Sequence, residues 1–254
     1  PLYSSAASDV YKRQAQPHDS LLLESADIET KKNLNCLAIL KAALRVTCHG
    51  HRVEVRALTN AGEVLLPPLR DRFRHRLVSR ETTTAVFEFP PSAEPDERQR
   101  LLAESTADIL RFFQLEATYS SPLLPFLGGG FAYDYLATFE DLPEVKPGPN
   151  SYPDYEFLVA QTVLEVDHLQ RTARLEGWDI DEDHLKAELD SLATRPETPR
   201  PTAPQRSKIR AVADADDATF RADVEKLQRK IHAGDIYQVV PARSFALELS
   251  LIHI

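Results

Sequence analysis

A run of three leucines ends in a carboxylate, a hydroxyl and a second carboxylate at Leu21–Asp27, LLLESAD. The leucines predict a short buried strand that delivers Glu24, Ser25 and Asp27 to its end. A carboxylate at Glu24 could meet an ammonium group, and the hydroxyl and backbone N–H of Ser25 could meet a carboxylate. Those are the two charged ends of a free amino acid. The alternative is a helix cap at Ser25 or Asp27, which the residue types alone favour because such caps are far commoner than ligand sites.

Three consecutive glycines, Gly128–Gly130, are a second candidate. They do not match GxGxxG, and the aromatic segment FAYDYL follows them in place of the helix that a phosphate-binding loop requires. The glycines are therefore expected to permit close backbone approach or a positive φ. Tyr133 and Asp134 have functional side chains, but a buried tyrosine hydroxyl partnered by a carboxylate is the favoured interpretation.

The acidic residues Asp214, Asp216 and Asp217 suggest a calcium loop that begins at Asp214, but its fifth position is Ala218 and Thr219 stands where the loop needs glycine. These acids therefore indicate a helix cap. The motifs HExxH, CxxC and GxSxG do not occur in the sequence. No catalytic residue and no metal ligand is identified in this chain.

The composition is that of an ordinary globular protein, with 43% hydrophobic and 27% charged residues among 254. The net charge of −9, without a concentrated basic element, argues against nucleic-acid binding. No apolar run reaches the roughly 18 residues of a membrane span, and a signal-peptide pattern is lacking. Cys36 and Cys48 lack metal-ligand spacing and are expected to be small core residues in a reducing cytosol, which predicts a cytoplasmic protein.

Alternating apolar residues predict a β-rich first half. The clearest element is a hairpin from Leu44 to Ala57 that turns at Gly50. Glu63–Leu66 could extend the hairpin into a meander, which Pro67-Pro68 would end. Further strands are expected at Leu21–Leu23, Thr82–Phe89, Tyr155–Val166, Thr172–Gly177 and Ile236–Phe245.

Helical periodicity is strongest at Asp217–Ala233. Asp216 or Asp217 can cap the start of this helix, and Gly234 can end it. Four prolines between residues 194 and 210 predict a linker or exposed loop. Other helices are expected at Pro95–Leu115 and Asp181–Ala193, with a short helix or irregular packed segment at Lys31–Ala43.

The segment Leu21–Lys31, LLLESADIETK, resembles the tryptophan-sensing motif near the start of anthranilate synthase component I. Enzymes of this family convert chorismate to anthranilate in tryptophan biosynthesis. The resemblance implies that Glu24 and Ser25 are ligands of tryptophan, the allosteric feedback inhibitor. The family often has a lysine eleven positions after the glutamate, where this sequence has Asn35.

Three further segments resemble the same family in the expected order. In the last of them Ala242 and Ser244 depart from the common serine and arginine. The resemblance covers roughly residues 21 to 247. The segments are GGGFAYDYLATFEDLP at Gly128–Pro143, YPDYEFLVAQTVLEVDH at Tyr152–His168 and GDIYQVVPARSF at Gly234–Phe245.

The resemblance implies an α+β fold of four layers, α/β/β/α, with two orthogonally packed, largely antiparallel sheets, truncated in this chain. It implies the large subunit of anthranilate synthase, which uses Mg²⁺ and receives ammonia from a glutamine amidotransferase subunit, component II. In the family, the metal-binding and catalytic residues lie beyond the last residue of this chain, so the isolated chain is expected to be inactive. Two alternatives stay open: aminodeoxychorismate synthase component I of folate synthesis, and a non-enzymatic small-molecule-binding module.

The expected organisation is a regulatory domain at residues 15–193, a proline-rich linker at 194–212 and the start of the chorismate-binding domain at 213–248. The terminal segments, PLYSSAASDVYKRQ at 1–14 and LSLIHI at 249–254, resemble translated sequencing-adapter sequence. The sequence also contains no methionine. The chain is therefore expected to be a fragment with non-native ends.

Overall fold

The computed structural model describes residues 19–25, 35–92, 94, 96–117, 121–140, 152–194 and 211–247. The chain divides into two compact units, residues 1–195 and 196–254. Within the described ranges, no helix combines the length and the apolar character that crossing a membrane requires. The terminal segments, Asp27 and most of the proline-rich stretch lie outside the described residues.

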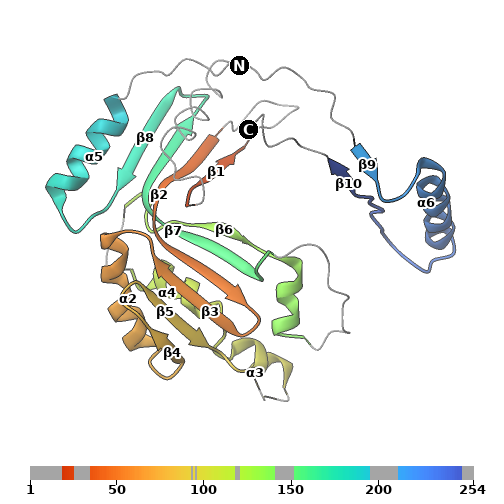
Figure 1. The fold of residues 1–254 in the computed structure, drawn as a ribbon, viewed down its shortest axis with the longest axis horizontal. Coiled ribbons are helices and arrows are strands. Elements are labelled where there is room, and N and C mark those ends of the chain that lie inside the picture. Colours follow the sequence, from red (N-terminus) through yellow and green to blue (C-terminus); the bar gives the residue numbers. More distant parts are fainter. Residues whose placement is uncertain are drawn as a thin grey trace. The chain divides into compact units, whose positions relative to one another are not determined.

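Two long antiparallel strands, β2 (Asn35–His49) and β7 (Tyr155–Asp167), form the centre of the first unit (Figure 1). On the side away from β7, β2 pairs with β1 and β3. On the side away from β2, β7 pairs with β6 and β8. The sheet continues from β3 through β5 to β4. The flanking strands are β1 (Leu21–Glu24), β3 (Arg52–Ala57), β4 (Leu77–Arg80), β5 (Thr84–Glu88), β6 (Leu127–Phe131) and β8 (Thr172–Gly177).

Register shifts between Ile39 and Leu44 interrupt the pairing of β2 with β7. Such irregularities bend a strand and increase its twist. The central pair accordingly curves in Figure 1. One half of the pair carries β1 and β8, and the other half carries β3 and β6.

The helix or irregular segment expected at residues 31–43 is wrong for the described residues 35–43, which belong to β2. Most side chains of β2 from Cys36 to Cys48 are buried, on both faces of the sheet. A strand covered on both faces is apolar at nearly every position, so it loses the alternation that identifies a strand in sequence. Cys36 and Cys48 are buried core residues, as predicted.

The strand extension expected at Glu63–Leu66 is also wrong, because Asn60–Arg72 forms helix α2. Thr59 has an extended backbone conformation, and its side chain accepts a hydrogen bond of 3.0 Å from the Gly62 backbone N–H. A threonine cap of this kind satisfies one of the donors that the first helical turn leaves free. The cap therefore starts a helix where the apolar pattern suggested a strand.

Pro67 and Pro68 lie inside α2 instead of ending it. An interior proline costs a helix roughly 3 kcal/mol. The helix buries Leu66, Leu69 and the following Phe73 almost completely. Each of these side chains contributes roughly 1.5–3 kcal/mol on burial, so tertiary packing offsets the two prolines.

The single helix expected at Pro95–Leu115 is instead two, α3 (Glu97–Leu102) and α4 (Asp108–Leu115). Asp96 caps α3 as a side-chain acceptor for the Gln99 N–H. Between the helices lies Thr106, which is 2% exposed and whose carbonyl accepts a 2.7 Å hydrogen bond from the Tyr155 hydroxyl. This hydrogen bond fixes the segment between α3 and α4 against β7.

The hairpin, three further strands and the last helix predicted for this unit are confirmed. The β2–β3 hairpin turns at Gly50, whose φ is +57°. Strand β5 and the β7–β8 pair form within the predicted ranges. Helix α5 (Glu182–Thr194) follows β8.

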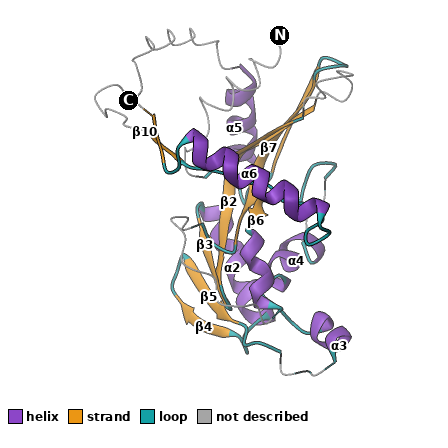
Figure 2. Ribbon diagram, turned by 90° about the vertical axis from the view of Figure 1, so that its right-hand side faces the viewer, coloured by secondary structure: helices purple, strands orange, loops and turns teal. Residues whose placement is uncertain are grey.

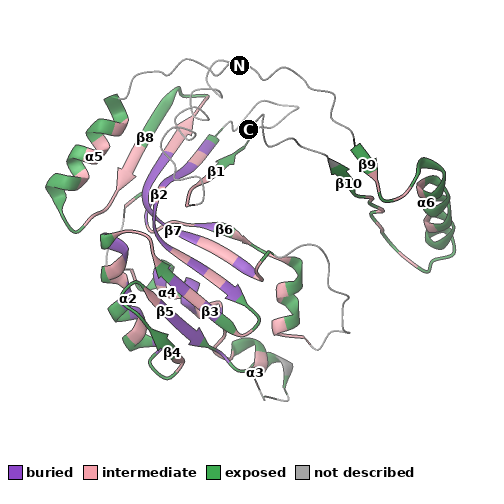
Figure 3. Cartoon of the chain, viewed as in Figure 1, coloured by how far each residue is buried: buried purple, intermediate pink, exposed green. Residues whose placement is uncertain are grey.

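Helices α2 and α4 pack on the same face of the sheet, where one apolar cluster contains residues from both helices and from β2, β3, β5 and β7 (Figure 2). Buried residues run along β2, β5 and β7 in Figure 3. Leu192 of α5 contacts a smaller cluster in the other half of the sheet. The described architecture is therefore a mixed α+β fold built on an eight-stranded antiparallel sheet. The four-layer arrangement of two orthogonally packed sheets stays a prediction.

The second unit contains helix α6 (Asp217–His232) and a two-stranded antiparallel sheet of β9 (Ala211–Ala213) and β10 (Phe245–Leu247). Asp216 caps α6 by accepting from the Thr219 N–H at 2.7 Å, as predicted for the acidic group. Gly234 follows the helix with φ +78°, as a terminating glycine should. The strand expected at Ile236–Phe245 is wrong except for its last residue, because β9 supplies a pairing partner only to β10.

Candidate functional site

Strand β1 carries the candidate amino-acid ligands at its end. Glu24 is its last residue and lies opposite Cys36, and both Glu24 and Ser25 are exposed. The Ser25 backbone N–H donates a 2.8 Å hydrogen bond to the Asn35 carbonyl. This N–H is engaged within the protein, which corrects the expectation that it could receive a ligand carboxylate. The groups of this pair that face solvent are the Glu24 carboxylate and the Ser25 hydroxyl.

The leucines of β1 are less buried than their sequence predicted. Leu21 and Leu22 are half-buried and Leu23 is 47% exposed. Among the described strands β1 pairs with β2 alone, so it lies at an edge of the described sheet. Leu21 and Leu22 contact different apolar clusters, so they lie on opposite faces. The helix-cap alternative lies outside the described residues.

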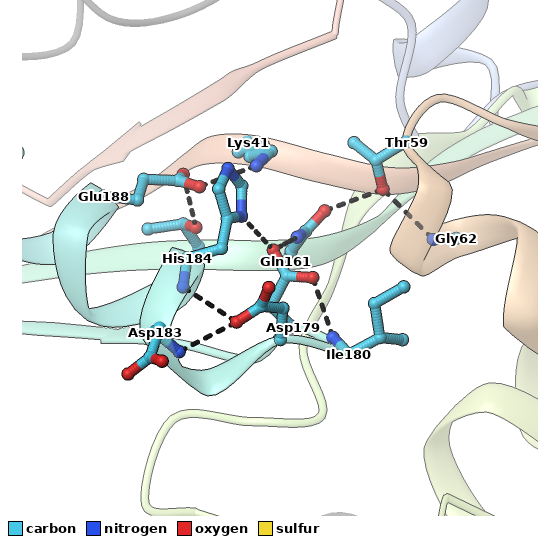
Figure 4. A network of polar contacts seen from close by, with 11 residues as sticks. Lys41, Thr59, Gly62, Gln161, Asp179, Ile180, Asp183, His184 and Glu188 are labelled. Atoms are coloured by element: carbon cyan, nitrogen blue, oxygen red, sulfur yellow. Dashed lines mark hydrogen bonds and ion pairs between the residues drawn. The ribbon is translucent and has the colours of Figure 1, made fainter.

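A second candidate site is a network of polar side chains that joins β2, β7 and α5 (Figure 4). The Lys41 ammonium lies 2.7 Å from Glu188, and the Thr162 hydroxyl donates to the same carboxylate at 3.3 Å. Gln161 is 1% exposed and donates through Nε2 to Asp179 at 3.1 Å. The network therefore ties α5 and the end of β8 to the central strands.

Three potential metal ligands meet in this network: the ligand atoms of Asp179, His184 and Glu188 lie within 4.8 Å of one another. Asp179 already accepts from Gln161 and from the Ile180 N–H, and Glu188 is paired with Lys41. Mg²⁺ prefers an octahedral set of oxygens, and this set includes an imidazole. These residues do not fit the Mg²⁺ that the family resemblance implies, and we interpret them as a structural network.

The Asp179 carboxylate is the most perturbed acid of the network. Burial alone would raise its pKa, but hydrogen bonds from His184 and from the backbone N–H groups of Ile180 and Asp181 outweigh burial and lower it. The His184 Nδ1 atom lies 2.9 Å from Asp179 Oδ2, and the Asp179 side chain is only 7% exposed. The group is therefore held as a carboxylate by the fold.

A cavity of about 380 Å³ lies beside the network and is lined by Asp19, Lys41, Thr59 and Glu188 among others. Its charged side chains already have partners, since Asp19 pairs with Arg45 and Lys41 pairs with Glu188. We assign no ligand to this cavity.

Tyr133 and Asp134 lie in a 3-10 helix at Tyr133–Thr138, and the expected buried hydroxyl–carboxylate pair is wrong: Tyr133 is 88% exposed. The tyrosine that meets a hydroxyl is the half-buried Tyr135, whose OH lies 2.8 Å from Thr106 Oγ1. Sequence reasoning missed Tyr135 because YDY offers two tyrosines, and only the packing against Phe131 and Tyr155 decides which one points inward.

The glycines of β6 serve close approach, as expected. A Cβ atom added at Gly129 would lie 2.7 Å from the Phe157 Cα of β7, and one added at Gly128 would overlap Leu21 of β1. Neither glycine has a positive φ. Gly128 and Gly129 therefore bring β6 against its neighbours and are packing positions, whereas a Cβ atom at Gly130 would meet nothing closer than 4.0 Å.

The fold and these segments define the class of protein. The family model described as chorismate binding enzyme matches residues 76–253, so the chain belongs to the family of chorismate-binding enzymes. Within this family it is a homologue of anthranilate synthase component 1.

Two relatives illustrate the similarity. Anthranilate synthase component 1 of Vibrio parahaemolyticus is 39% identical over 240 residues, which cover 90% of this chain and 44% of that protein. The protein of the same name from Vibrio cholerae is 36% identical over 241 residues, which cover 90% of this chain and 46% of that protein. The chain therefore spans about half the length of the curated relatives it matches.

A solved structure shares the fold. The crystal structure of anthranilate synthase component I from Streptococcus pneumoniae matches 93% of this chain and 43% of that chain, with a TM-score of 0.51 and 14% identity. The shared part is a mixed α+β fold with an antiparallel sheet.

Proposed function

We propose that the full-length protein containing this chain is the large subunit of an anthranilate synthase. It converts chorismate and ammonia to anthranilate and pyruvate, and component II supplies the ammonia from glutamine. The observation that carries the proposal is identity of 36–39% across 90% of the chain with proteins of that name. In this proposal residues 15–193 form the regulatory domain and residues 213–248 begin the chorismate-binding domain. Mg²⁺ would be held by residues of the full-length protein that this chain does not contain and would bind the substrate carboxylate.

Activity of the full-length protein tests the proposal. Purified protein with chorismate, ammonium and Mg²⁺ should form fluorescent anthranilate, and glutamine should replace ammonium only when component II is added. Accumulation of aminodeoxychorismate without anthranilate would instead support the folate enzyme. Absence of any turnover of chorismate would support a binding module.

We further propose that Glu24 and Ser25 bind the feedback inhibitor tryptophan. The two residues are adjacent and exposed at the end of β1, with the chain held there by the Ser25–Asn35 hydrogen bond. A carboxylate at Glu24 suits the ammonium group of the amino acid, and the Ser25 hydroxyl suits its carboxylate.

Ser25→Ala in the full-length protein tests this assignment. A hydrogen bond to a charged group is worth about 1.5–3 kcal/mol, so the tryptophan concentration for half-inhibition should rise about tenfold or more. Ser79→Ala, an exposed serine of β4, is the matched control and should leave inhibition unchanged. Wild-type inhibition in Ser25→Ala would refute the role of Ser25.

A further inference from the structure

Leu21 of β1 occupies the space that a side chain at Gly128 of β6 would fill. A Cβ atom built on Gly128 would overlap Leu21 Cδ2 and would lie 2.9 Å from Ile39 Cδ1. Apolar carbons settle about 3.5–4.0 Å apart. Any side chain at position 128 therefore has to displace Leu21, and Ile39 has to move with it.

Pairing with β2 holds β1 in the sheet. Among the described strands it pairs only with β2, through four residues, and its last two residues are exposed. Leu21 contacts the apolar cluster that includes Ile39, and Leu22 contacts the cluster on the opposite face. The pairing with β2 fixes the register of β1, and the seating of Leu21 over Gly128 is a contact with β6 that a side chain at position 128 would disturb.

We propose that Gly128 is a positioning residue for tryptophan sensing, because the space above its Cα seats Leu21 and so sets where Glu24 and Ser25 stand. This inference rests on the proposed function of Glu24 and Ser25. Glu24 lies three residue steps from Leu21, about 10 Å along an extended strand. A sideways shift of Leu21 is transmitted along so short a strand to its end. Gly128 itself touches neither tryptophan nor chorismate in this proposal.

The neighbouring glycine is a matched control. A Cβ atom at Gly130 meets nothing closer than the Tyr152 hydroxyl at 4.0 Å, so Gly130→Ala adds the same methyl group to the same strand without a clash. Gly129 is unsuitable, because its added Cβ would strike the β7 backbone. Comparing Gly128→Ala with Gly130→Ala removes the general effect of replacing a strand glycine.

The experiment measures half-inhibition by tryptophan, and kcat and KM for chorismate without tryptophan, in the full-length protein. Gly128→Ala should raise the half-inhibitory concentration at least fivefold and keep kcat and KM within twofold of wild type. Gly130→Ala should match wild type in all three. A role in stability alone would change kcat and the inhibition together.

Leu21→Ala provides a second test that does not depend on how well Gly128→Ala folds. This substitution removes the Leu21 atoms that a Cβ atom at position 128 would displace, and it should weaken inhibition. The double variant Leu21→Ala with Gly128→Ala should be inhibited as Leu21→Ala alone is. Wild-type inhibition in Gly128→Ala, with inhibition weakened in Ser25→Ala, would refute the positioning role and leave the tryptophan site standing. Wild-type inhibition in Ser25→Ala as well would overturn the site, and the inference with it.

Discussion

At the scale of residues, one hydroxyl joins a helix to the sheet. Thr59 Oγ1 accepts from the Gly62 N–H to cap α2 and donates at 2.7 Å to Oε1 of Gln161 on β7. Gln161 is 1% exposed, and its amide nitrogen donates to Asp179. A buried amide has to find partners for both its ends, and here Thr59 supplies one of them. The cap of α2 and the buried network around Gln161 therefore both depend on Thr59 Oγ1.

Thr59→Ala should destabilise the first unit by about 2–4 kcal/mol, the sum of a lost cap, about 1 kcal/mol, and an unsatisfied buried acceptor, about 1–3 kcal/mol. Thr59→Ser keeps the hydroxyl and should lie within about 1 kcal/mol of wild type. Urea unfolding followed by the fluorescence of Trp178, the single tryptophan, reports on this region, since its indole N–H donates to Ala160. Equal stabilities of the two variants would contradict the assignment.

Asp179 makes the same region sensitive to acid. Its pKa is lowered in the folded protein, so its contribution to stability is complete above the ordinary value and is lost as pH falls through the folded pKa. The ordinary pKa of an aspartate is about 3.9, and the folded value lies below it, so the loss falls below about pH 4. Asp179→Asn should therefore be less stable than wild type at pH 7, and the difference should shrink as pH falls below 4.

Urea midpoints at pH 7, 4 and 3 measure this difference. Asp190→Asn, an exposed acid of α5, is the control and should track wild type at every pH. A difference between Asp179→Asn and wild type that stays constant down to pH 3 would show that its carboxylate is not the group responsible.

At the scale of elements, α2 lies so close to β2 that one residue of the helix has to be glycine. A Cβ atom at Gly62 would overlap the Ala43 carbonyl oxygen and would lie 2.8 Å from its carbon. Ala43 belongs to the middle of β2 and is fully buried, so it has no room to retreat. The same closeness allows Leu66 and Leu69 to reach the core.

Gly62→Ala should destabilise the protein although alanine is the better helix former by about 0.5–1 kcal/mol. Overpacking against backbone typically costs about 1–3 kcal/mol, so the clash should exceed the gain in propensity. The measurement is the urea midpoint by Trp178 fluorescence, with Gly130→Ala as the unhindered control. A midpoint higher than that of wild type would mean that α2 can move away from β2.

At the scale of the whole molecule, the chain contains a complete sheet unit and a much smaller second unit. No described residue of α6 is buried, although Phe220, Val224 and Leu227 recur on one face of this helix. An amphipathic helix gains most of its stability from packing its apolar face. The curated relatives are about twice as long as this chain, and in the proposed function the further part carries the chemistry.

The isolated 254-residue chain should therefore form no anthranilate from chorismate, ammonium and Mg²⁺ under conditions in which the full-length protein does. Catalysis by the isolated chain would place the catalytic residues among those present here. Circular dichroism of the isolated chain is the control that its secondary structure has formed.

The sequence by itself determined the features that depend on near neighbours. The hairpin at Gly50, the cap at Asp216 and helix α5 each follow from a few adjacent residues. The family resemblance was likewise legible in short segments, and the comparisons confirm it.

Only the tertiary structure decided the rest, because those features depend on partners far along the chain. Residues 35–43 form a strand because they pair with β7, and Leu192 of α5 packs against their side chains. The chain between α3 and α4 is fixed by the hydrogen bond from the Tyr155 hydroxyl to the Thr106 carbonyl. The Ser25 N–H is unavailable to a ligand because it donates to the Asn35 carbonyl. No local pattern reveals that Leu21 would fill the space over Gly128, since burial and steric fit arise only when distant segments are packed together.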